Sequence, residues 1–257
     1  MRCLVGFFGL TRSLPLTVGS IRAHVLDPLR AAGIKTVTAG HFNLPDTVTN
    51  PRSGEAGFVP DRSEAALLDL DACWVEPQTD AAVQAALAAV HDGPDLYGDG
   101  YRSLRNLCHQ LHSLDRVWSL LCLFDPAPDD IVLLLRPDLL YRDRLNPARD
   151  LALLTAGKAD LIVPAWQDWG GLNDRFAFCA VRAARAYATR LRLLPEAREA
   201  LGAIHPEFFL RFVVACHGLR VGLTDLRAAR VRADGRVASN DMPMLAPAQA
   251  AAWSAVA

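Results

Sequence analysis

The run Ile131–Asp138, with the sequence IVLLLRPD, restricts the fold of this chain more than any other segment. Five aliphatic residues in succession, with no polar residue between them, are typical of a strand that is covered on both faces. Such strands are usual in parallel sheets, which bind ligands just beyond the carboxyl ends of their strands. Arg136 and Asp138 stand at that end. A cation beside a carboxylate at this position suits a phosphorylated ligand.

The N-terminal part of the chain predicts a strand–helix–strand unit. Cys3–Phe8 and Ile34–Thr38 are expected to be strands, and Val18–Ala32 a helix with Thr17 as its N-cap. Pro28 lies inside this helix and is expected to kink or split it. Because crossover connections are right-handed and join parallel strands, this unit predicts a mostly parallel sheet.

Hydrophobic periodicity predicts the elements that follow. The clearest is a helix over Ser103–Leu123, in which leucines recur at three- and four-residue spacing and Asn106 and Gln110 share a polar face. The segment Gly40–Pro60 has little periodicity and is expected to be a long functional or mobile loop. The remaining strands are expected at Ala72–Val75, Asp160–Ala165, Phe176–Val181 and Arg220–Leu223. The remaining helices are expected at a segment opened by Asp61 and Glu64 and at Thr79–His91, Arg182–Leu194, Glu196–Leu201 and Pro206–His217. A hairpin is expected at Asp234–Gly235.

The length fits one large α/β domain or two small ones, and the sequence shows no internal repeat and no domain linker. We expect a single domain that spans residues 1–245, followed by an Ala-rich helical tail at residues 246–257. The net charge of −1 lacks the excess of positive charge that is typical of proteins that bind nucleic acid. The chain shows neither a secretory signal pattern nor an apolar run of the roughly 20 residues that cross a membrane, so we expect a cytoplasmic protein without a transmembrane segment. The oligomeric state is not evident from the sequence.

The cysteines and histidines form no metal-binding motif. None of the six cysteines belongs to a C-x-x-C pair, and most lie in apolar stretches, so we expect reduced core residues. His109 and His112 are three residues apart on the predicted long helix, but the sequence reveals no third ligand. A zinc site is therefore not expected there.

Three further segments hold candidate site residues. Thr11 and Arg12 follow the first predicted strand, where a phosphate contact is expected. Trp169, two glycines and then Asn173 and Asp174 precede an apolar strand, which combines an aromatic face, an adaptable backbone and polar groups suited to a sugar. Glu207 lies in the first turn of a predicted helix, where it is either a general base or only a favourable partner of the helix dipole. Each of these motifs also has a purely structural explanation as a surface charge or a polar turn.

Taken in order, these segments resemble bacterial glycosyltransferase-like proteins of the GT-A nucleotide-diphospho-sugar transferase fold. The matching segments are Val5–Arg12, the helix that carries Asn106, Gln110, Ser113 and Leu114, Leu135–Leu139, Gly171–Ala177 and Pro206–Leu210. The resemblance implies a GT-A-like, Rossmann-type mixed and mostly parallel sheet flanked by helices. It also implies a role in surface polysaccharide or glycoconjugate synthesis.

In this family, the position of Arg136–Asp138 carries a D-x-D motif, and here Arg136 replaces the first acid. Two alternatives follow from the resemblance. Either Asp138 alone binds Mn²⁺ or Mg²⁺, or Arg136 neutralises the donor diphosphate without a metal. Glu207 falls where inverting members place their base, Asp174 is the rival, and a retaining mechanism remains if neither acts as a base.

The leading hypothesis is therefore a glycosyltransferase that takes a sugar from a nucleotide diphosphate and passes it to an acceptor hydroxyl. The residues expected to bind the donor are Thr11, Arg12, Asn106, Gln110, Arg136, Asp138, Trp169 and Asn173, and the catalytic candidates are Glu207 and Asp174. Two alternatives stay open. One is a non-catalytic carbohydrate- or nucleotide-binding protein with a decayed site, and the other is a nucleotidyltransferase.

Overall fold

The computed structural model describes residues 1–238 and 241. Its centre is a seven-stranded sheet in the order β10-β8-β9-β6-β1-β2-β5. The strands are β1 (Arg2–Gly9), β2 (Lys35–Leu44), β5 (Ala72–Pro77), β6 (Ile131–Leu135), β8 (Leu161–Pro164), β9 (Phe176–Ala180) and β10 (Val221–Thr224). Six of them run parallel, and only β9 runs antiparallel to both of its neighbours. The predicted fold class, a mixed and mostly parallel sheet flanked by helices, is confirmed.

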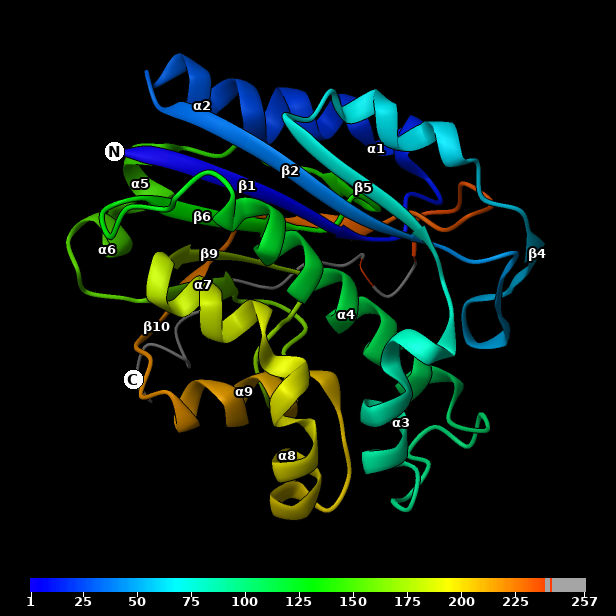
Figure 1. Cartoon of the computed structure of the whole chain (residues 1–257). Coiled ribbons are helices and arrows are strands. Elements are labelled where there is room, and N and C mark those ends of the chain that lie inside the picture. The colour runs from blue at the N-terminus through cyan, green and yellow to red at the C-terminus, as the bar shows by residue number, and fades with distance from the viewer. Residues whose placement is uncertain (239–240, 242–257) are drawn as a thin grey trace.

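Helices cover both faces of this sheet (Figure 1). On one face lie α1 (Leu14–Ile21), a π-helical turn (Arg22–Leu26) and α2 (Asp27–Ala31). On the other lie α3 (Gln84–Val90), α4 (Arg102–Cys122), α7 (Val181–Ala188), α8 (Leu194–Leu201) and α9 (Pro206–Cys216). Two hydrophobic clusters result, one on each face, and the all-aliphatic β6 contributes alternate residues to both. This explains why the sequence of β6 has no polar alternation.

Short elements complete the described chain. They are the hairpin β3 (Val48–Asn50) and β4 (Glu55–Phe58), the pair β7 (Leu139–Tyr141) and β11 (Ala228–Arg230), α5 (Pro147–Asp150), α6 (Ala152–Thr155), and 3-10 turns at Pro51–Ser53, Arg62–Leu68, Asp80–Val83 and Arg190–Leu193. The predicted turn at Asp234–Gly235 is confirmed, since Val231 and Val237 form a β-bridge across it. The predicted tail at residues 246–257 lies outside the described residues.

Two local predictions in the first half of the chain are wrong. The first helix begins at Leu14 rather than after Thr17, because Pro15 fits the first turn of a helix. Thr17 is instead a buried residue inside α1, and its hydroxyl donates to the carbonyl oxygen of Pro137 at 2.5 Å. Pro28 does split the helix as predicted, with the π-helical turn immediately before α2.

The second wrong prediction concerns Gly40–Pro60, which is not one long loop. β2 continues to Leu44, since it pairs with β1 on one side and β5 on the other, and a short hairpin follows. Polar residues His41 and Asn43 therefore lie in a buried strand.

The cysteines are also only partly as expected. All six are free; Cys3, Cys108 and Cys179 are buried, whereas Cys73, Cys122 and Cys216 are exposed. Among the described residues, none of the helices has the length and apolar character needed to cross a membrane.

Candidate functional site

A cavity of about 530 Å³ opens at the edge of the sheet where the parallel strands end. Its lining comes from the segments that follow β1, β2, β5, β6 and β8, from the residues just before β9, from the end of β11, and from α4 and α9. β9 reaches this edge with its first residues because it runs against the other strands. This is the position at which open α/β sheets bind ligands.

Eight of the ten predicted site residues line this one cavity. They are Arg12, Asn106, Gln110, Arg136, Asp138, Trp169, Asp174 and Glu207. The other two lie outside the lining. Asn173 is buried, and its amide donates to the Trp166 carbonyl and accepts from the Arg175 backbone, so it shapes the loop before β9. Thr11 is buried as well, and its hydroxyl bonds to Glu64.

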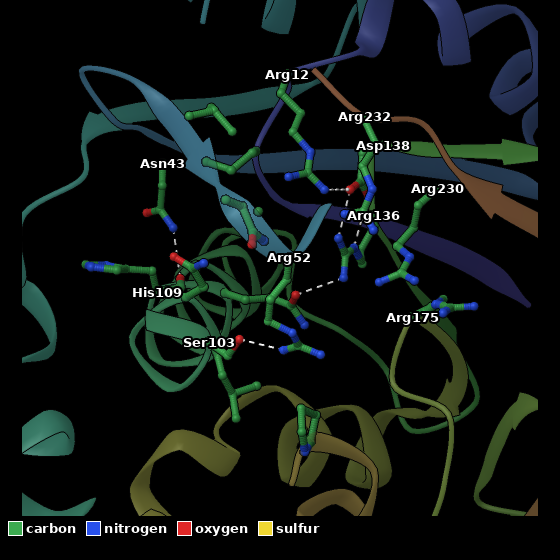
Figure 2. A pocket seen from close by; sticks show the side chains of 18 of the residues that line it. Arg12, Asn43, Arg52, Ser103, His109, Arg136, Asp138, Arg175, Arg230 and Arg232 are labelled. Carbon is green, nitrogen blue, oxygen red and sulfur yellow. Dashed lines mark hydrogen bonds and ion pairs between the residues drawn. The ribbon is translucent and has the colours of Figure 1, made fainter. Parts of the chain in front are cut away.

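Asp138 is the centre of the cationic wall of the cavity (Figure 2). Its carboxylate accepts from Arg12 at 2.8 Å and from two nitrogens of Arg136, Nε at 3.0 Å and an Nη at 2.8 Å. Burial alone would raise the pKa of the Asp138 carboxyl, but the charges of Arg136 and Arg12 outweigh burial and hold that pKa well below its usual value. Asp138 therefore stays ionised and fixes the two guanidinium groups.

The cationic wall, called the arginine cluster below, consists of the side chains of Arg12, Arg136, Arg175, Arg230 and Arg232. Three buried carboxylates pair with it, and each bridges two arginines: those of Glu55, Asp138 and Asp241. Among the described residues, five guanidinium groups pair with three carboxylates here, an excess of two positive charges within this cluster, and Asp174 in the same lining acts electrostatically on Arg136 and Arg175.

The pKa of two members of the arginine cluster is lowered, first by burial and then by neighbouring arginines, whereas the charge of Asp138 outweighs burial and raises the pKa of Arg136. Burial and then the charge of Arg230 lower the pKa of Arg175 to about 10. Burial, Arg230 and Arg12 likewise lower the pKa of Arg232 to about 10. Like charges held together in a buried place store unfavourable energy, which an entering anion relieves. The cluster thus has the positive charge and the hydrogen-bond donors that an anionic ligand requires.

The surroundings of Asp138 do not fit Mn²⁺ or Mg²⁺. These hard cations take oxygen ligands, whereas both carboxylate oxygens of Asp138 already accept from guanidinium groups. Among the described residues, Asp138 belongs to no cluster of three or more side chains spaced as metal ligands. The geometry therefore favours the alternative in which Arg136 and its neighbours supply the positive charge.

Asp174 and Glu207 lie on the other side of the cavity. Asp174 Oδ2 accepts from Gln110 Nε2 at 3.3 Å and lies 3.6 Å from the buried Arg190. Glu207 Oε2 lies 3.0 Å from Nδ1 of His205, without hydrogen-bond geometry. Asp174 is therefore held by a hydrogen bond from Gln110 and an ion pair with Arg190, whereas the Glu207 side chain, among the described residues, has the imidazole of His205 beside it.

The loop that carries Trp169 packs directly on the start of α9. Gly171 approaches the Glu207 backbone so closely that a Cβ atom there would overlap it, and Leu172 N donates to Glu207 O at 3.0 Å. Trp169 has a positive φ of 50° and is 58% exposed at the cavity mouth. The glycine therefore sets the distance between the aromatic side chain and Glu207.

Sequence reasoning missed part of the lining. Arg52 comes from the segment taken as a loop, and it donates to Ser103 at 2.6 Å and lies over the Tyr97 ring at 4.0 Å. Arg230 and Arg232 flank a β-bridge residue near the described C-terminal end. Their i, i+2 spacing beside a hairpin signal was the available clue, since alternate residues of an extended segment face the same side.

Comparisons with known proteins give a similarity of fold. No protein-family model and no curated protein matches the sequence. Among solved structures, the chain is similar to mouse xyloside xylosyltransferase 1 in its apo form, with a TM-score of 0.40 and 14% identity over 87% of this chain and 84% of that one. It is also similar to an active-site mutant of LgtC, with a TM-score of 0.43 and 14% identity over 87% of this chain and 72% of that one.

Proposed function

We propose that this chain is a glycosyltransferase that moves a sugar from a nucleotide diphosphate to an acceptor hydroxyl. The observation that supports this most is the excess of two positive charges in the arginine cluster at the carboxyl edge of the sheet. A diphosphate that joins a nucleoside to a sugar carries one negative charge on each of its phosphates. Guanidinium forks bind such oxygens in pairs, so the charge and the chemistry of the cluster match this ligand.

In this proposal the arginine cluster binds the diphosphate and stabilises the charge that grows on it as the sugar leaves. Asp138 acts inside the protein, as the counter-ion that fixes Arg12 and Arg136, rather than as a metal ligand. Trp169 stacks on the apolar face of a sugar ring, while Gln110 and Asp174 hold hydroxyl groups. Asn106 lies on the same cavity-facing side of α4 and contacts the donor.

Glu207 is the proposed base. It takes the proton of the acceptor hydroxyl as the oxygen attacks the anomeric carbon, and the bond from that carbon to the diphosphate breaks. A single displacement of this kind inverts the anomeric centre. Asp174 is assigned the orienting role because Gln110 and Arg190 already engage its carboxylate. On the sequence resemblance, we further propose a cytoplasmic role in surface polysaccharide or glycoconjugate synthesis.

Calorimetry of the full chain with UDP, GDP and their sugars tests the proposal, in parallel with Mn²⁺ and with EDTA. We expect one nucleotide to bind with equal affinity under both conditions. Arg232→Gln should weaken binding by about 10- to 100-fold, because a charge-assisted hydrogen bond contributes about 1.5–3 kcal/mol. Arg192→Gln, whose side chain is 72% exposed, is the matched control and should bind as the wild type does.

Binding that requires Mn²⁺, or no binding of any nucleotide, would contradict this assignment. The catalytic half has its own readout, the release of free sugar from the bound donor in the absence of acceptor. Binding without hydrolysis or transfer would assign the chain as a non-catalytic nucleotide-sugar binder. Release of pyrophosphate from a nucleoside triphosphate would assign a nucleotidyltransferase.

A further inference from the structure

Three side chains with metal-ligating atoms meet between the sheet and α4, outside the lining of the cavity. They are His41 from β2, Glu76 from β5 and His112 from α4, and their ligand atoms all lie within 4.8 Å of one another. His41 is fully buried, whereas Glu76 and His112 are partly exposed. We call these three residues the His–Glu cluster.

Hydrogen bonds determine which nitrogen of His41 carries the proton. The Ser113 hydroxyl lies 2.6 Å from the His41 carbonyl oxygen, which only accepts, so the hydroxyl proton points there. The hydroxyl oxygen of Ser113 itself accepts from Gly9 N at 2.8 Å. Nδ1 of His41, 3.0 Å from Ser113 Oγ, must therefore donate to it. In the neutral imidazole, Nε2 then has a lone pair and no proton.

The unprotonated Nε2 of His41 lies beside the carboxylate of Glu76. His41 Nε2 lies 3.2 Å from Glu76 Oε1 without hydrogen-bond geometry, and the nitrogen is buried. His112 Nε2 is 2.8 Å from the same oxygen. A lone pair beside a negative charge, away from water, is unfavourable unless a cation lies between them. We propose that the His–Glu cluster binds a divalent transition-metal ion, with Zn²⁺ as the best-matched ion.

The donor set supports this choice. Two imidazoles and one carboxylate suit Zn²⁺ and related transition metals, whereas Mg²⁺ and Ca²⁺ prefer oxygen ligands. In a tetrahedral site with bonds of about 2.0–2.1 Å, ligand atoms lie roughly 3.3 Å apart. The two measured separations, 3.2 Å and 2.8 Å, are close to that spacing. The partial exposure of Glu76 and His112 leaves a path for the ion and room for a water ligand.

One competing cation lies nearby. The guanidinium of Arg116, one turn after His112 on α4, is 4.2 Å from the Trp74 ring centroid and acts electrostatically on Glu76. The ion would share the Glu76 carboxylate with this charge. The Ser113 hydrogen bond supplies the support behind the ligand that metal-bound histidines usually have, because it fixes the ring orientation of His41.

A bound ion would connect three elements that are far apart in the sequence. It would link α4 to β2 and β5, and the same helix carries Asn106, His109 and Gln110 to the cavity. The ion would therefore join these three elements at a structural site outside the cavity, separate from Asp138. Its presence does not depend on the proposed transfer reaction.

The test is a Zn²⁺ titration by calorimetry, on the untagged full chain after treatment with EDTA and its removal. We expect one Zn²⁺ per chain, a rise in melting temperature with Zn²⁺, and no heat with Mg²⁺. His112→Gln and, independently, Glu76→Gln should each reduce Zn²⁺ affinity at least tenfold, which corresponds to about 1.4 kcal/mol. His217→Gln, which changes an exposed histidine outside the cluster, is the matched control and should bind like the wild type.

Bound Co²⁺ provides a second readout, since its visible absorption reports imidazole ligands in a site of low coordination. The inference is overturned if the wild type binds less than one ion, or if both cluster variants bind Zn²⁺ as tightly as the wild type. Circular dichroism checks that each variant is folded. Because neither His112 nor Glu76 lines the cavity, nucleotide binding in the same proteins reports separately on the proposed function.

Discussion

The substitution Asp138→Asn tests whether this aspartate is an internal counter-ion. Its side chain is 3% exposed and lies 2.8 Å from both Arg12, which is 9% exposed, and Arg136, which is 17% exposed. Removing one partner of a buried ion pair costs about 3–5 kcal/mol, because the other charge stays buried without compensation. Here two guanidinium groups lose the same partner, so we expect the free energy of unfolding to fall by at least about 3 kcal/mol.

Urea denaturation followed by tryptophan fluorescence measures this loss. For a chain of this size, each kcal/mol lowers the melting temperature by about 2–4 °C, so a decrease of roughly 6–20 °C is expected. Asp27→Asn is the matched control, because Asp27 is 54% exposed and pairs with Arg30 on the surface. That change should cost less than about 1 kcal/mol. If Asp138→Asn costs no more than Asp27→Asn, the reasoning about the arginine cluster is refuted.

Three further predictions follow from the site and its supports. Glu207→Gln should lower turnover by about 10²- to 10⁴-fold and leave the nucleotide affinity unchanged, as measured by steady-state assay and calorimetry; weaker donor binding would argue against a base. Gly171→Ala should destabilise the chain by about 1–3 kcal/mol or more, because its methyl group overlaps the Glu207 backbone, whereas Gly19→Ala in open space on α1 should be neutral or stabilising. Burial raises the pKa of Glu64 from 4.5 to about 7, so the folded chain binds this proton more tightly than the unfolded chain. The free energy of unfolding should therefore fall as the pH rises between these values, and urea titrations at several pH values should show a flatter profile for Glu64→Gln; equal slopes would contradict the shift.

The sequence predicted the elements whose burial pattern is strong. α4 is recognisable by its three-to-four-residue period, and β6 because its aliphatic run is too short for a buried helix and ends at polar residues. Arg136 and Asp138 were found through β6, since the residues after a buried parallel strand lie at the edge where ligands bind.

The features that the sequence did not predict depend on contacts between distant segments. The apolar run of β9 looks the same in either direction, so its antiparallel orientation is decided by the neighbouring strands β6 and β8. His41 and Asn43 resemble loop residues, but strands on both sides of β2 extend it. Ser113 and His109 on α4 accept hydrogen bonds from His41 Nδ1 and from the Asn43 amide. The sequence did not predict the His–Glu cluster either. β2, β5 and α4 each supply one of its three ligands, so no short motif contains them.

The reversed direction of β9 has a consequence for adaptation. The segment from Ala165 to Arg175 leaves the sheet at the end of β8 and re-enters it at the start of β9, at the same edge. It is thus an insertion between two adjacent hydrogen-bonded strands, and its length is not constrained by a crossover through the core. Changing the length of its exposed part, at Trp169 and Gly170, would remodel the mouth of the cavity while leaving strand order and register intact. This segment is the natural place to engineer the choice of molecule that enters the cavity.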